Sequence, residues 1–348
     1  MAQVDSGKAF GYLVGEDLRR AAAGARLLPL VVGCRSLLGR DEVESVLRGP
    51  VDRLDSIATA RDLALVAYFE GMTLGAGIGF GLCAGPNWLY LGVQTRHSTI
   101  SYEVLNRDKR PARKGHAFLS RVFVELVHNR VPNRHDCIRR ETMAPKGWES
   151  LLHDEVKVVH CAGSDDAPIE VIFGGSFNPF HKGHARLAEI AHEITGRPVS
   201  LEMSISNVEK PPLHYHAIAE RLEGLERWRA PYHGHTVLTR GATFVEKART
   251  ISHGLTFVVG MDTLLRIGDP RFYGDARSME ATLTELRKDH DCSFLAFPRA
   301  TKDGRVLGHD EFLTLPLLLR EMAHLVKPEM VQEVLHLSSS DIRRRGEK

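Results

Sequence analysis

The sequence predicts an α/β protein with two α/β domains, and three observations predict it. At 348 residues the chain exceeds the length at which one hydrophobic core usually stops growing, about 250 to 300 residues. Helical patterns alternate with short apolar runs in both halves, which is typical of α/β domains. In the second half the apolar runs are nearly continuous, as in parallel strands whose two faces are both covered.

The predicted elements follow this alternation. In the first half, helical patterns and apolar runs cover 17–28, 28–33, 41–49, 59–71, 74–83, 88–95 and 115–131. In the second half we expect strands at 169–175, 198–206, 256–260, 292–298 and 331–337, and helices at 184–196, 216–230, 244–254 and after 341. Segment 131–167 is polar, loses its periodicity and ends in GSDDAP, a linker-like composition. The predicted domains are therefore 1–165, with the linker, and 166–348.

Charge and cysteine content limit the partners and the compartment. Lys and Arg total 46 against 44 for Asp and Glu, so no broad field attracts a nucleic acid or an anionic membrane. The five cysteines form no CxxC pair, which favours a reducing compartment over a disulfide framework or a zinc site. No stretch approaches the ~18 apolar residues of a membrane span. We expect a soluble cytoplasmic protein with neither a nucleic-acid nor a membrane partner.

The stretch GGSFNPFHKGH (174–184) concentrates unusual chemistry at a predicted strand-to-helix junction. Gly174 and Gly175 lack a Cβ, so the backbone can turn sharply and approach a ligand closely. The following helix begins with unpaired N–H groups and a positive dipole end, which suits phosphate. His181 and His184 are three residues apart and can lie on one face beside that end. The stretch predicts a polyphosphate cradle; the alternative is an ordinary connection with solvated imidazoles.

This stretch resembles the signature of the HxGH nucleotidylyltransferase superfamily, and LSSSDIRRR (337–345) resembles the second signature of that superfamily. The resemblance implies a Rossmann-like open parallel sheet for the C-terminal domain. It implies catalytic roles for His181 and His184 at the reacting phosphate. It also implies nucleotide binding by Gly174, Gly175, Ser176, Phe177, Asn178 and Gly183, and by Ser339, Ser340 and Arg343 at the departing pyrophosphate. Leu337 in place of Ile and Ser340 in place of Thr are departures from the second signature.

Three further segments, 206–225, 239–251 and 255–274, resemble nicotinate and nicotinamide mononucleotide adenylyltransferases. The resemblance implies that Gly260 and Asp262 lie near the nucleotide, and that Lys210, Thr239 and Arg240 bind substrate. Two alternatives remain at this point: Asp262 as the N-cap of a helix, and Lys210 as a solvated loop lysine.

The implied activity is transfer of AMP from ATP to nicotinamide or nicotinate mononucleotide, with release of pyrophosphate, in NAD biosynthesis. The expected partners are ATP and a mononucleotide, and the expected cofactor is Mg²⁺ carried with ATP, with no metal ligands on the protein. One alternative is cytidylyl or adenylyl transfer to another phosphorylated acceptor, such as a phosphocholine-like or phosphopantetheine substrate. The other is a catalytically idle nucleotide sensor.

The N-terminal half shows a fainter resemblance to the C-terminal domain of competence-damage-inducible proteins, whose catalytic members deamidate nicotinamide mononucleotide. LLPLVVGCRSLLGR, the stretch 59–82 and WLYLGVQT carry this resemblance, but the Ser-Cys-Thr-Gly-Gly stretch of active members is missing. We therefore expect a non-catalytic domain that binds a ligand or mediates homo-oligomer assembly. The stretch GAGIGFG (75–81) predicts close packing of a strand backbone rather than a dinucleotide fingerprint.

Overall fold

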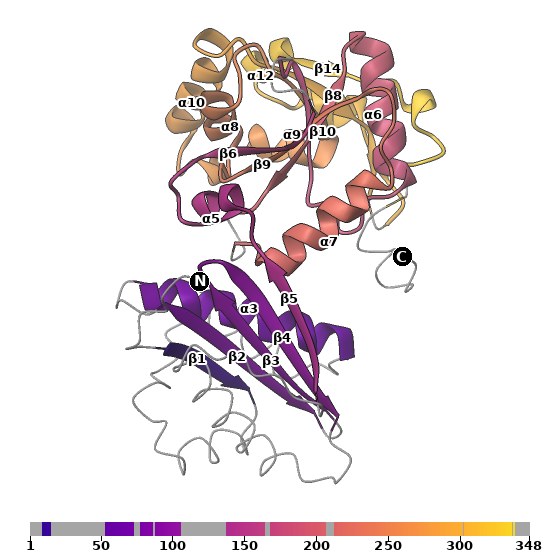
Figure 1. Cartoon of the computed structure of the whole chain (residues 1–348). Helices are drawn as coiled ribbons and strands as arrows, with labels where there is room; N and C mark the ends of the chain where they lie inside the picture. The colour runs from indigo at the N-terminus through magenta and orange to yellow at the C-terminus, as the bar shows by residue number, and fades with distance from the viewer. Residues whose placement is uncertain are drawn as a thin grey trace. The chain divides into compact units, whose positions relative to one another are not determined.

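The computed structural model describes residues 9–14, 53–72, 77–85, 88–105, 137–163, 168–206, 212–301, 303–335 and 337. The chain forms two compact units (Figure 1). Unit 1 is Met1–Glu149 with Glu209–Ala219, and unit 2 is Ser150–Val208 with Glu220–Lys348. The division falls at Ser150 rather than near 165, and a short segment from the second half belongs to unit 1.

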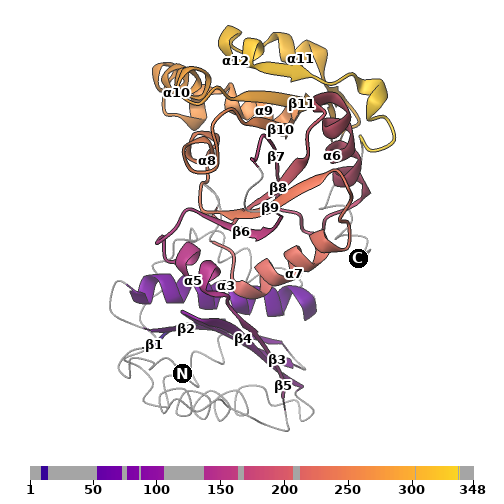
Figure 2. The same ribbon diagram turned by 45° about the horizontal axis from the view of Figure 1, so that its top comes forward.

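Unit 1 contains a five-stranded sheet in the order β1-β2-β3-β4-β5. Strand β1 runs parallel to β2, and each later neighbour is antiparallel. Figure 2 shows helix α3 (Arg53–Met72) lying along this sheet. The strands are β1 (Ala9–Val14), β2 (Ile78–Gly85), β3 (Trp88–Thr95), β4 (Ser98–Leu105) and β5 (Ile138–Met143). The expected elements at 17–28, 28–33, 41–49 and 115–131 lie outside the described residues.

Glycines on β2 and β3 allow α3 to approach the sheet closely. A Cβ at Gly81 would lie 2.5 Å from the carbonyl oxygen of Ala60, and a Cβ at Gly79 would meet the backbone of Tyr68. Gly92 on β3 faces the same helix at Ala60. Within the described part of the stretch 75–81, Gly79 and Gly81 thus serve backbone packing, as predicted. The helix expected at 59–71 is confirmed within α3.

Unit 2 contains a seven-stranded sheet in the order β14-β11-β10-β7-β8-β9-β6. All neighbours are parallel except β6, which pairs antiparallel with β9 at the edge. Helices α6 and α10 lie on opposite sides of this sheet (Figures 1 and 2). The strands are β6 (Val158–Ala162), β7 (Val171–Gly174), β8 (Val199–Ser204), β9 (His233–Thr239), β10 (Thr256–Gly260), β11 (Ser293–Phe297) and β14 (Ala323–Leu325). The predicted parallel sheet is confirmed.

The remaining elements connect these strands. A two-stranded ribbon of β12 (Arg299–Ala300) and β13 (Val306–Leu307) follows β11. The helices are α5 (Lys146–Leu152), α6 (Lys182–Thr195), α7 (Tyr215–Glu226), α8 (Phe244–Thr250), α9 (Met261–Ile267), η1 (Pro270–Phe272), α10 (Ala276–Lys288), α11 (His309–Leu313), α12 (Leu317–Met322) and η2 (Pro328–Met330). None of these described helices, nor α3, is both long and apolar enough to cross a bilayer.

The strand order places a topological switch point between β7 and β10. From β7 the chain adds β8 and β9 on one side, then returns to add β10, β11 and β14 on the other. This is the Rossmann order, in which ligands bind outside the carboxyl ends of the strands at the switch point. The sequence motif 174–184 begins at the carboxyl end of β7, so the fold brings it to that position.

Two expected elements are wrong. Residues 331–335 form turns instead of a strand, because Ala323–Leu325 already occupies the free edge of β11. An apolar run this short does not distinguish a strand from a packed turn, and Val331 is simply buried. Segment 131–167 is not only a linker: it contains β5, α5 and β6. The partly exposed edge strand β6 lacks the continuous apolar character of the central strands.

Candidate active site

The turn between β7 and α6 is compact and packs on a buried aromatic side chain, Phe177. Phe177 is 1% exposed and has a φ of 43°, a left-handed conformation that is uncommon for a bulky residue. A Cβ at Gly175 would lie 2.6 Å from the Phe177 ring, so only glycine fits there. The Asn178–Pro179 peptide bond is cis. The turn holds the loop backbone against the core at the carboxyl end of β7.

His181 and His184 form a close, tilted ring pair at the start of α6. Their ring centroids are 3.8 Å apart, with planes inclined at 30°. His181 is the N-cap residue, and its Nδ1 accepts a hydrogen bond from the Gly183 N–H at 3.1 Å. The Nδ1 of His184 accepts one from the His181 N–H at 3.3 Å. An acceptor Nδ1 requires a neutral ring to carry its proton on Nε2, so both rings are fixed as Nε2–H donors.

Burial keeps both rings uncharged. Burial lowers the pKa of His181 to about 4, with a smaller effect of the Arg299 charge. Burial lowers the pKa of His184 to about 3, with smaller effects from His181 and Arg299. The rings of Phe173, Phe177 and Phe180 surround His184 at centroid distances of 5.9, 5.3 and 5.2 Å. The His181 Nε2 is buried and finds no hydrogen-bond partner within the described part of the chain, so it is available to a ligand.

Acid should destabilise the protein through these rings. An unfolded histidine is protonated below a pKa of about 6.5, whereas the folded rings stay neutral to about pH 4 at His181 and about pH 3 at His184. Between these pH values only the unfolded chain takes up the protons. The stability that the two neutral rings allow is therefore fully present above pH 6.5 and is lost as the pH falls toward 4. Urea unfolding at several pH values should show the free energy of unfolding decreasing over this range, and decreasing less in His184→Asn. Equal slopes in both proteins would contradict this.

The end of β10 lies beside β7 and contributes Gly260 and Asp262. Gly260 is the N-cap residue of α9, and Asp262 lies in the first turn, so the N-cap alternative for Asp262 is wrong. The Asp262 carboxylate lies 3.7 Å from the Nε of Arg299, which follows β11. A Cβ at Gly260 would lie 2.5 Å from the Asp262 Oδ1. A side chain at residue 260 would therefore collide with the groups above the strand end.

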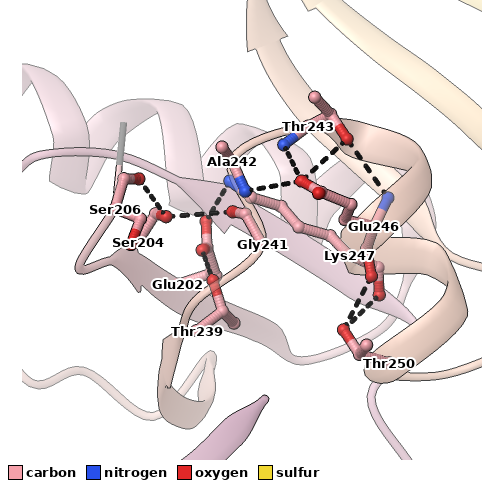
Figure 3. A network of polar contacts seen from close by, with 10 residues as sticks. All are labelled: Glu202, Ser204, Ser206, Thr239, Gly241, Ala242, Thr243, Glu246, Lys247 and Thr250. Atoms are coloured by element: carbon pink, nitrogen blue, oxygen red, sulfur yellow. Dashed lines mark hydrogen bonds and ion pairs between the residues drawn. The ribbon is translucent and has the colours of Figure 1, made fainter. Parts of the chain in front are cut away.

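On the other side of β7, a buried ion pair covers Gly174. Lys247 Nζ lies 2.8 Å from Glu202 Oε2, and the two side chains are 13% and 1% exposed. Thr239 donates a further hydrogen bond to the Glu202 carboxylate (Figure 3). A Cβ at Gly174 would lie 2.8 Å from Glu202 Oε2 and 3.7 Å from Lys247 Nζ. The strand ends β7, β8 and β9 are thus joined by one polar network beside the turn.

The first turn of α8 places Lys247 in this network. Thr243 and Glu246 cap the helix reciprocally, and the Glu246 carboxylate accepts from the N–H groups of Ala242 and Thr243 at 2.8 and 2.9 Å (Figure 3). Ser204 donates to the Gly241 carbonyl at 2.9 Å, which ties the end of β8 to the loop before α8. The loop and helix start are therefore fixed independently of the ion pair.

The structure places the other predicted residues as follows. The Ser176 carbonyl accepts a hydrogen bond from Arg221 at 3.1 Å. Thr239 is buried in the Glu202 network, and the Arg240 guanidinium donates to the carbonyls of Leu151 and Leu152. These contacts are structural, and substrate binding by Thr239 and Arg240 stays a prediction. Lys210, Ser339, Ser340 and Arg343 lie outside the described residues, as does the helix expected after 341.

The start of the second signature (337–345) lies close to the first signature (174–184). Leu337 is described, and a Cβ at Gly183 would lie 3.3 Å from the Leu337 Cβ and 2.9 Å from the His181 ring. The Ala300 N–H bonds to the Leu335 carbonyl at 3.4 Å. Residues 335 and 337 therefore lie beside the strand ends and the start of α6, and glycine at 183 permits this contact.

Sequence reasoning missed Arg299, Glu202 and Lys247. Arg299 follows the apolar strand β11, so the rule that ligands bind at carboxyl ends of parallel strands could have indicated it. Glu202 lies inside β8, two residues before its end, where an acidic residue in an apolar run is the only signal. Lys247 lies three residues beyond a helix start, and no local signal marks it. Within the described residues, no group of three or more His, Cys, Asp or Glu side chains could hold a metal ion.

Two known proteins and one protein family are similar to this chain. A probable nicotinate-nucleotide adenylyltransferase from Caulobacter sp. (strain K31) is 43% identical over 58 residues, which are 16% of this chain and 31% of that protein. The chain thus matches less than a third of that relative. The Plasmodium falciparum nicotinic acid mononucleotide adenylyltransferase complexed with NaAD has 13% sequence identity and a TM-score of 0.35, over 51% of this chain and 83% of that one.

The sequence model of the Cytidylyltransferase-like family matches residues 172–345, which is half of the 348-residue chain. The match does not reach residues 20–130, so the resemblance of the N-terminal half to competence-damage-inducible proteins stays a prediction. It begins inside β7 and includes the histidine pair, the switch point and the second signature. The chain belongs to the Cytidylyltransferase-like family, and its C-terminal half is a nucleotidyltransferase-like domain.

Proposed function

We propose that the protein transfers the AMP group of ATP to nicotinate or nicotinamide mononucleotide and releases pyrophosphate. The observation that carries this proposal is the pair of neutral imidazoles at the switch point, both fixed as Nε2–H donors. Neutral donors at a helix N-terminus suit a polyphosphate, since they bind it without requiring a proton to be taken up first.

The reaction needs positioning and charge neutralisation rather than a base. A phosphate oxygen of the mononucleotide, already ionised at neutral pH, attacks the α-phosphorus of ATP in line. The new P–O bond forms as the bond to the β-phosphate oxygen breaks, and pyrophosphate leaves with that electron pair. Orientation of two bound reactants can supply about 7 to 11 kcal/mol of such a barrier. His181 and His184 would donate hydrogen bonds to the transferring phosphate as negative charge grows on its oxygens.

Mg²⁺ would enter with ATP as part of the substrate, where it neutralises phosphate charge. Within this proposal the residues of the chain bind the phosphates and orient the acceptor. The name of the Caulobacter protein supports a pyridine mononucleotide as the acceptor.

A panel of donors and acceptors tests the proposal. The full-length protein should release pyrophosphate with ATP plus nicotinate or nicotinamide mononucleotide, and a coupled alcohol dehydrogenase assay should detect NAD when the acceptor is the nicotinamide form. CTP should replace ATP poorly. The family description makes cytidylyl transfer the competing activity, so phosphocholine and phosphopantetheine form the second arm. Turnover with CTP and those acceptors alone would replace the proposal, and nucleotide binding without any turnover would indicate a sensor.

A further inference from the structure

Arg299 lies at the switch point and has no role in the reaction proposed above. It begins β12, two residues after the end of β11. Its side chain is 43% exposed, and its Nε is 3.7 Å from the Asp262 carboxylate. Within the described part of the chain, its guanidinium makes no closer polar contact. A half-exposed pair at this distance adds little to stability, so folding alone does not account for a cation at this position.

The two ion pairs beside the switch point differ in a way that separates their roles. Glu202 and Lys247 are in direct contact at 2.8 Å and shielded from solvent above Gly174. Asp262 and Arg299 stand above Gly260 on the neighbouring strand, but they are looser and nearly half exposed. A loose, exposed pair can separate at little cost when a stronger anion arrives. The Arg299 side of the switch point is therefore the side that can respond to a ligand.

Arg299 also lies near the histidine pair and near the described residues 335 and 337. Its charge contributes to lowering the pKa of His181 and His184, so its field reaches the histidine pair. Its neighbour Ala300 hydrogen-bonds to Leu335, and two residues later Leu337 lies against Gly183. The backbone beside Arg299 is thus tied to Leu335, close to Leu337 and the start of α6.

We propose that Arg299 is a ligand of the donor's triphosphate, which it reaches by exchanging its loose contact with Asp262 for phosphate oxygens. This inference rests on the proposed function for the choice of a nucleoside triphosphate. A guanidinium presents a planar fork of donors that matches two phosphate oxygens, whereas an ammonium acts as a single point charge. Asp262 positions the guanidinium in the free protein, and the histidine pair binds the same phosphate chain from the α6 side.

Equilibrium binding tests the proposal without requiring catalysis. Isothermal titration calorimetry would compare the full-length wild type with Arg299→Ala, Arg299→Lys and Arg271→Ala, using ATP with Mg²⁺, pyrophosphate and AMP. Arg271 is a matched control because it is an exposed arginine paired with an aspartate, Asp269, outside the site. Arg299→Ala should raise the Kd for ATP at least tenfold, since a lost charged hydrogen bond is worth about 1.5 to 3 kcal/mol. Arg299→Lys should recover part of the loss, and Arg271→Ala should match the wild type.

The probes also show which phosphates Arg299 binds. A loss confined to ATP and pyrophosphate places the contact on the departing group, and a loss that includes AMP places it on the transferring phosphate. Unchanged ATP binding in Arg299→Ala, with an unchanged melting temperature, would overturn the proposal even if the wild type is an active transferase. If the wild type releases no pyrophosphate but Arg299→Ala still weakens ATP binding, the proposed activity fails and the Arg299 assignment stands.

Discussion

His184→Asn should lower the turnover number for pyrophosphate release by about 10³-fold, with little change in fold. The Oδ1 of asparagine can take the place of the ring Nδ1 and accept the His181 N–H that the histidine accepts at 3.3 Å. The shorter side chain cannot supply a donor at the position of Nε2. Loss of one preorganised donor to a developing oxyanion costs about 10²- to 10³-fold in turnover. Steady-state kinetics with ATP and nicotinate mononucleotide would measure the effect.

Two further variants separate loss of the donor from loss of packing. His192→Asn changes a histidine on the same helix whose Nδ1 contacts the Arg197 carbonyl at 2.8 Å, and it should keep the wild-type rate. His184→Gln extends an amide donor toward the Nε2 position and should be faster than His184→Asn. The assignment would be wrong if His184→Asn kept more than half the wild-type turnover while ATP was saturating.

The strand-to-helix junction could be predicted because its signal is local. Glycines end β7, and His181 and His184 lie within the first turn of α6, so a stretch of eleven residues carries both the backbone shape and the donors. The predicted parallel sheet has the same origin, since central strands covered on both faces must be nearly continuous apolar runs. Burial of the rings, which lowers both pKa values, could not be predicted, because Phe173 and Phe180 reach His184 only after folding.

The rest of the site depends on contacts between distant segments. Lys247 meets Glu202 across 45 residues, and Arg299 meets Asp262 only because β10 and β11 are neighbours. The chain order of the strands does not state which pairs are adjacent, so neither ion pair has a sequence signature. The same limit explains segment 209–219, which follows β8 in the chain but belongs to unit 1.

Glu202→Ala should reduce the free energy of unfolding by about 3 to 5 kcal/mol, the usual cost of removing one partner from a buried ion pair. The Lys247 side chain, which is 13% exposed in the wild type, would lose its carboxylate partner. The Thr239 hydroxyl would lose its hydrogen-bond acceptor. Lys247→Met should lower the free energy of unfolding by a similar amount, because it leaves the Glu202 carboxylate buried without a positive partner; the Glu202 side chain is 1% exposed. Urea denaturation followed by circular dichroism would measure both.

The double variant Glu202→Leu/Lys247→Met distinguishes a paired charge from simple packing. Replacing both partners by apolar groups removes the stranded charge, so the double variant should be more stable than either single variant. Additive losses would show that the two side chains act independently. Because Glu202 Oε2 lies above Gly174, an apolar pair that restores stability should still alter the turn at the end of β7. We therefore expect the double variant to fold well and yet bind ATP less tightly than the wild type, which would separate the contribution of this pair to stability from its contribution to the cradle.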